Sequence, residues 1–160
     1  MRTPDPIRVV RMALRVSLAA AFLSAVADRF GWWEPVGQGS WGSMDRFADY
    51  AHQLVPFASG WSLTVIVWAA TAVEASLGAL LLAGWWPKLV GAATCLVLTI
   101  FGMAMAVSLG IESPLSYSVF TAASAAAAYA ILGVPAPPPA AGASCGPETS
   151  NRRTPARCHG

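Results

Sequence analysis

Three long stretches of the chain are apolar and almost free of charge. Residues 61–83 contain one charged side chain, Glu74, whereas residues 89–109 and 115–134 contain none. A helix needs about 20 predominantly apolar residues to cross the hydrocarbon core of a bilayer. The pattern therefore predicts transmembrane helices over about 61–83, 89–109 and 115–134.

A fourth apolar stretch near the N-terminus is shorter and begins among arginines. Residues 16–27 carry no charge, and three arginines precede them: Arg8, Arg11 and Arg15. Arginine stems can lie along an apolar helix while the guanidinium groups reach the lipid head groups, which predicts a spanning helix over about 9–30. The alternative is a cleaved signal peptide, because Ala25-Val26-Ala27 fits a small-x-small cleavage site.

Two segments lie outside these stretches. The loop 31–60 contains a run at 45–54 whose apolar side chains share one helical face, which predicts a short interfacial helix over one end of the bundle. From residue 135 onward, prolines and small or polar residues leave too little apolar surface to fold. We expect an all-α protein, an integral membrane four-helix bundle over 1–134, with a disordered Pro-rich C-terminal tail over 135–160.

Composition and charge support a lipid environment. Apolar residues make up 56% of the chain and charged residues only 11%, compared with roughly 25% charged residues in soluble domains. The net charge of +2 is too small, and too scattered, to indicate nucleic-acid binding. The expected partner is the lipid bilayer, and nucleic acid is not expected.

The positive residues in the short connections predict the orientation. Arginines precede the first expected helix and follow the fourth, and Lys88 lies between the second and the third. The opposite connections carry an acidic excess, with Glu112 as the single charge of the last loop. Lysine and arginine accumulate in cytoplasmic loops. Both termini are therefore predicted to be cytoplasmic.

Glu74 is the strongest indication of a site. A charged group at the bilayer centre costs about 3 kcal/mol or more, so Glu74 should face the bundle interior and be paired, protonated or hydrated. Ala70, Thr71 and Gly78 lie on the same helical face and leave room beside it. In one hypothesis Glu74 carries a proton or orients a quinone, lipid or other apolar substrate. In the other it fixes packing through a hydrogen bond to a hydroxyl group: Ser108, Tyr117, Ser118 or Thr121.

Asp28 and Arg29 lie at the end of the first expected helix, directly before aromatic residues. This position favours interfacial anchoring. If the first loop folds back over the bundle, Arg29 could instead counter Glu74 or hold an anionic ligand.

The residues offer little for a metal site or a self-contained enzyme. His52 has no second histidine in any apolar stretch, and the three cysteines lack C-x-x-C spacing. Cys145, Cys158 and His159 fall in the expected tail, where we predict no metal site. Sequence motifs of phosphate-binding loops and zinc proteases are missing.

Several motifs in order along residues 8–133 resemble the DoxX family of small four-helix bacterial membrane proteins. They include Asp28-Arg29-Phe30-Gly31, Glu74 with Gly78, and Pro114-Leu115-Ser116-Tyr117-Ser118. Ala20 and Ala25 depart from the family pattern, which tends to have glycine there. Ser116 stands where an acid is expected, so any role that depends on that acid is not carried over.

The resemblance implies a subunit or anchor of a redox complex in the bacterial cytoplasmic (inner) membrane, quinone-linked or active in oxidative stress. A quinone would be its cofactor and a soluble oxidoreductase subunit its partner. The resemblance favours a non-catalytic membrane subunit over a self-contained enzyme and leaves catalysis open. One alternative is a binder, carrier or isomerase of an apolar small molecule or lipid, and another is a structural assembly scaffold. The predicted intramembrane polar site comprises Glu74, Thr71, Tyr117 and Ser118, with Asp28 and Arg29 at the interface.

Overall fold

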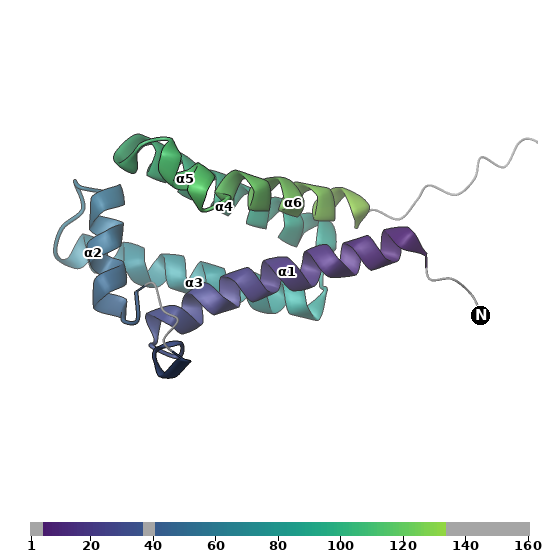
Figure 1. Ribbon diagram of the computed structural model, residues 1–160, viewed down its shortest axis with the longest axis horizontal. Helices are drawn as coiled ribbons and strands as arrows, with labels where there is room; N and C mark the ends of the chain where they lie inside the picture. The colour runs from purple at the N-terminus through teal and green to yellow at the C-terminus, as the bar shows by residue number, and fades with distance from the viewer. Residues whose placement is uncertain (1–4, 37–40, 134–160) are drawn as a thin grey trace, which may run out of the picture.

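The computed structural model describes residues 5–36 and 41–133, and the regular structure in these residues is entirely helical (Figure 1). A short 3₁₀ helix, η1 (Glu34–Val36), follows the first helix. The α-helices are α1 (Pro6–Arg29), α2 (Met44–Leu54), α3 (Trp61–Ala83), α4 (Pro87–Leu109), α5 (Glu112–Ser116) and α6 (Val119–Leu132). The expected tail 135–160, with Cys145, Cys158 and His159, lies outside the described residues.

Three of these helices, α1, α3 and α4, are long and apolar enough to cross a membrane. Helix α3 has the bounds that its apolar stretch predicts. Helix α4 begins two residues earlier than expected, because Pro87 occupies a first-turn position where proline is well tolerated. Asp5 starts α1 early by accepting a hydrogen bond from the Ile7 N–H. The three helices indicate a multi-pass membrane protein.

The fourth apolar stretch does not form the single helix predicted for 115–134. It is divided into α5 and α6 by a turn at Tyr117 and Ser118, where Ser118 has the left-handed conformation with φ of +55°. Helix α6 has 14 residues and is about 21 Å long, shorter than a hydrocarbon core of about 30 Å. The prediction of one continuous helix was wrong because apolar composition does not reveal a local break of this kind.

Because left-handed backbone is costly for residues with a Cβ atom, Ser118→Gly should stabilise the protein by up to about 1 kcal/mol. Ser124→Gly is the matched control, since Ser124 lies inside α6 in helical backbone. There the same exchange should destabilise by about 0.5 kcal/mol. Unfolding in mixed micelles measures both changes, and equal signs for the two variants would contradict the strain at Ser118.

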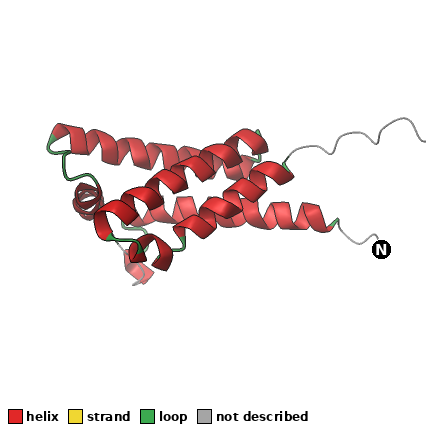
Figure 2. Cartoon of the chain, turned by 90° about the horizontal axis from the view of Figure 1, so that it is seen from above, coloured by secondary structure: helices red, strands yellow, loops and turns green. Residues whose placement is uncertain are grey.

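The long helices run along one axis and the short ones gather at one end (Figures 1 and 2). Helices α1 and α3 pack against each other, as do α4 and α6, and α1 also contacts α6. The beginning of α1 and the end of α6 lie at the opposite end from α2 and α5 (Figure 1). The main core is shared by these helices: Leu18, Ala19, Phe22, Leu77, Leu81, Val90, Ala126 and Tyr129.

Helix α2 is the short helix expected near 45–54, and it lies across the end of the molecule (Figure 1). Its apolar face packs inward in two clusters. Phe47 and Ala51 pack with Val67 of α3, and Leu54 packs with Met105 of α4 and Val119 of α6. This position makes α2 a cover over one end of the long helices.

Candidate functional site

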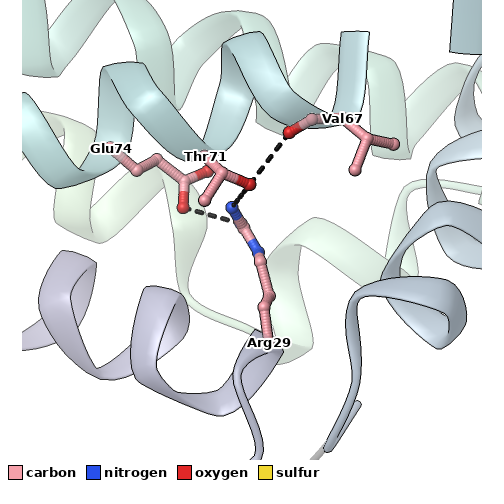
Figure 3. Close-up of polar contacts among 4 residues, drawn as sticks. All are labelled: Arg29, Val67, Thr71 and Glu74. Atoms are coloured by element: carbon pink, nitrogen blue, oxygen red, sulfur yellow. Dashed lines mark hydrogen bonds and ion pairs between the residues drawn. The ribbon is translucent and has the colours of Figure 1, made fainter. Parts of the chain in front are cut away.

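A buried ion pair joins α1 to α3. The Nη2 of Arg29 donates to Oε2 of Glu74 at 2.6 Å, and its Nη1 donates to Oγ1 of Thr71 at 2.8 Å. Thr71 in turn donates to the carbonyl oxygen of Val67 at 2.8 Å (Figure 3). The side chains of Arg29 and Glu74 are only 1% and 13% exposed. The carboxylate that the sequence singles out is therefore paired with an arginine from the end of another helix.

The pair forms because α1 ends well inside the length of α3. Phe30, the residue after α1, lies 6.5 Å from Trp68 between ring centroids, about two turns into α3. Gly78 allows this close packing, since a Cβ there would lie 2.9 Å from the Leu23 side chain of α1. From this position the long arginine side chain reaches the middle of α3.

Aromatic side chains cover the arginine. The Cζ of Arg29 lies 3.6 Å from the ring centroid of Phe47 and 5.6 Å from that of Trp41. Such cation–π contacts strengthen when they are shielded from water. Asp28 is also buried, accepts a hydrogen bond from the Trp41 backbone N–H at 2.9 Å, and acts electrostatically on Arg29. The ionisable side chains of Asp28, Arg29 and Glu74 thus lie close together, covered by Trp41 and α2.

A cavity of about 200 Å³ adjoins the ion pair. Arg29 and Glu74 line it, together with mostly apolar side chains of α1, α4 and α6. A cleft of about 680 Å³ lies next to it. Six residues line both spaces, which are therefore adjacent: Ala21, Ala25, Trp41, Phe101, Tyr117 and Val119.

The cleft is more polar than the cavity. Asp28, Tyr50 and Tyr117 lie along it together with Ser24 and Trp33. Burial raises the pKa of the Tyr50 phenol above its ordinary value, and the nearby Tyr117 raises it further. The Tyr50 hydroxyl therefore keeps its proton at neutral pH and can donate a hydrogen bond.

A second groove of about 330 Å³ lies between α2, α3 and α4. Its walls are apolar side chains, apart from Glu74. Glu74, Val97 and Phe101 line both this groove and the smaller cavity. The carboxylate is thus placed at the boundary between two apolar spaces.

The structure brings together only part of the predicted site. Glu74 and Thr71 both accept hydrogen bonds from Arg29, whereas Tyr117 lines the cavity and does not hydrogen-bond to Glu74. Ser118 is exposed at the break between α5 and α6 and is not a lining residue of the cavity. Ser108 donates to the Leu54 carbonyl oxygen. Glu74 is therefore paired with Arg29 rather than with one of the hydroxyl groups.

Asp28 and Arg29 are only 6% and 2% exposed, and Arg29 is the counter-ion of Glu74, which the sequence suggested as the alternative to interfacial anchoring. Sequence reasoning did not assign Phe47 and Trp41 to the site. The inward face of the predicted helix at 45–54 was a usable signal for Phe47, whereas Trp41 lies outside any periodic segment and had none.

Within residues 5–36 and 41–133, no three metal-ligating side chains gather. His52 lies apart from the cavity lining, with Nδ1 2.9 Å from the Ala58 carbonyl oxygen.

No protein-family model, no curated protein and no solved structure matches the chain. The geometry of the cavity and its ion pair is the basis for a functional proposal.

Proposed function

We propose that this chain is a DoxX-type membrane subunit that binds a lipid-soluble small molecule against the Arg29–Glu74 pair. Helices α1, α3, α4 and α6 form its four-helix bundle, with Thr71 and Tyr117 also at the site. The observation that carries the proposal is that the pair lines a mostly apolar cavity, which adjoins a wider cleft. Ligand sites are typically concave, mostly apolar and equipped with a few polar groups.

The location of the pair within the bundle supports binding over a purely structural role. Intramembrane ionisable groups are costly and usually serve a function. An assembly scaffold would need the ion pair for packing but would need no cavity beside it. A binder, carrier or isomerase of a lipid would use the same cavity, so the geometry favours this group of functions over a scaffold.

The resemblance to the DoxX family supplies the setting of the proposal. It favours the bacterial cytoplasmic membrane, a quinone as the bound molecule and a soluble oxidoreductase as the partner. The distribution of arginine and lysine favours cytoplasmic termini. In this setting the chain anchors the oxidoreductase, and its cavity holds the quinone near that partner.

Filling the cavity should weaken binding. Ala25 lines both the cavity and the cleft, so Ala25→Leu should weaken binding of a short-tailed benzoquinone by at least about tenfold, or 1.4 kcal/mol. Quinones quench tryptophan fluorescence, and Trp41 lies in the cavity wall. The measurement is the saturable quenching of tryptophan fluorescence by the quinone, with the protein in nanodiscs. The part of the quenching that comes from Trp41 is identified by its loss in Trp41→Phe.

Ala20→Leu is the matched control. Ala20 is exposed on the same helix and lines none of the three spaces. The Ala20→Leu variant should bind the benzoquinone with the same affinity as the native chain. If Ala25→Leu also keeps native affinity, or if the native chain shows no saturable quenching, a quinone site in the cavity is ruled out.

Association with a redox partner has its own test. Native chain purified from its host under mild detergent should retain a flavoprotein, haem protein or sulfur-transfer protein in stoichiometric amount. Recovery of a bound lipid or quinone without such a partner would favour the carrier.

A further inference from the structure

The proposed cavity contains a hydrogen-bond donor that the protein does not use. We infer that it selects a ligand whose head is an uncharged acceptor, a carbonyl oxygen, and that the Arg29 Nε–H is the donor that binds it. This inference rests on the proposed function and specifies the chemistry of its ligand.

The hydrogen bonds of Arg29 leave Nε available. Each terminal nitrogen donates one hydrogen bond, Nη1 to Thr71 and Nη2 to Glu74. The Nε is buried and has no hydrogen-bond partner among the described residues. Phe47 covers one face of the guanidinium group, and Arg29 forms part of the cavity wall. Nε is therefore the one nitrogen of the guanidinium group without a hydrogen-bond partner among the described residues, and its N–H is the donor that we assign to a molecule in the cavity.

A buried hydrogen-bond donor without an acceptor is unfavourable. Leaving such a group without an acceptor costs about 1–3 kcal/mol, and more when the group is charged. A ligand that supplies an acceptor removes this cost on binding, which gives it an advantage over a purely apolar molecule of the same size. The empty hydrogen-bonding position thus favours ligands with an acceptor in the head group.

The local charge selects among such acceptors. Asp28 and Glu74 carry two negative charges when ionised, against the single positive charge of Arg29, so the cluster has a net charge of −1. An anionic head group would bring the net charge of the site to −2. In a site of low dielectric constant, like charges repel strongly. A cationic head group would offset the net charge but could not accept a hydrogen bond from Nε–H. A neutral carbonyl satisfies the donor and leaves the charge unchanged.

The test uses three photoreactive probes in nanodiscs. They share one diazirine-bearing alkyl chain and differ only in the head, which is a methyl ketone, a carboxylate or a trimethylammonium group. Mass spectrometry maps the cross-links. The ketone should label the cavity-lining peptides of α1 and α6 at least about tenfold more than either charged probe, a preference of about 1.4 kcal/mol.

Arg29→Lys keeps the positive charge and removes Nε–H, so the preference for the ketone should disappear. Arg11→Lys makes the same exchange near the other end of α1 and should keep it. Isotope-edited infrared spectra of the native chain give a second readout that needs no variant. The carbonyl stretch of the bound ketone should move to lower frequency, as for a strong hydrogen bond.

The possible failures are distinguishable. Equal or stronger labelling by the carboxylate or the ammonium probe, or an unshifted carbonyl stretch, would overturn the head-group inference while leaving a ligand in the cavity. Failure of all three probes to label the cavity, together with no saturable quinone quenching, would overturn the proposed function itself.

Discussion

Arg29→Ala is expected to destabilise the protein by about 3–5 kcal/mol, because it leaves the Glu74 carboxylate buried without its counter-ion. The variant also removes the cation–π contact with Phe47 and the hydrogen bond to Thr71. These contacts join α1, α2 and α3 at one point, so their loss should loosen the covered end of the molecule. Unfolding in mixed micelles with increasing dodecyl sulfate, followed by tryptophan fluorescence, measures the loss.

Two further variants distinguish the effect of an unpaired buried charge from the effect of losing an arginine side chain. Arg29→Leu combined with Glu74→Leu removes both charges and should recover most of the stability, since buried ion pairs can often be replaced by apolar residues without loss. Arg46→Ala removes an exposed arginine from α2 and should change stability by less than about 0.5 kcal/mol. If Arg29→Ala lowers the free energy of unfolding no more than Arg46→Ala does, the ion pair does not stabilise the packing of α1 on α3.

The sequence predicts α3 and α4 closely because their apolar stretches are long, contain at most one charged residue, and end at turn-forming residues. Gly84 closes α3 in the left-handed conformation, and Pro87 opens α4. These signals are local, so they can be read without knowing the fold. The same holds for α2, whose apolar face follows from helical spacing alone.

The break at Ser118 and the partner of Glu74 could not be predicted in this way. Ser118 adopts an unfavourable backbone conformation that its residue type does not suggest. The partner of Glu74 depends on where α1 ends relative to α3, which is a tertiary property. The sequence suggested Arg29 as one candidate counter-ion, but the structure was needed to place it beside Thr71 and under Phe47.

The second large effect is expected for Gly91→Ala in α4. A Cβ at Gly91 would lie 2.8 Å from both the backbone nitrogen and the Cβ of Ala130 in α6. Helices in membranes associate largely through close packing at small residues. Since a backbone cannot rotate away from the added methyl group, we expect a loss near the upper end of the 1–3 kcal/mol that overpacking usually costs.

Gly102→Ala is the matched control within α4. Its Cβ would lie 2.9 Å from the Phe120 ring, a side chain that can turn aside, so unfolding in mixed micelles should show a smaller loss. The two variants also differ in their consequence for the cavity. Displacement of α6 by Gly91→Ala moves Val119 and Ala122, which line the cavity, and should weaken quinone binding as well. Equal losses of stability in the two variants would contradict a tight backbone contact between α4 and α6.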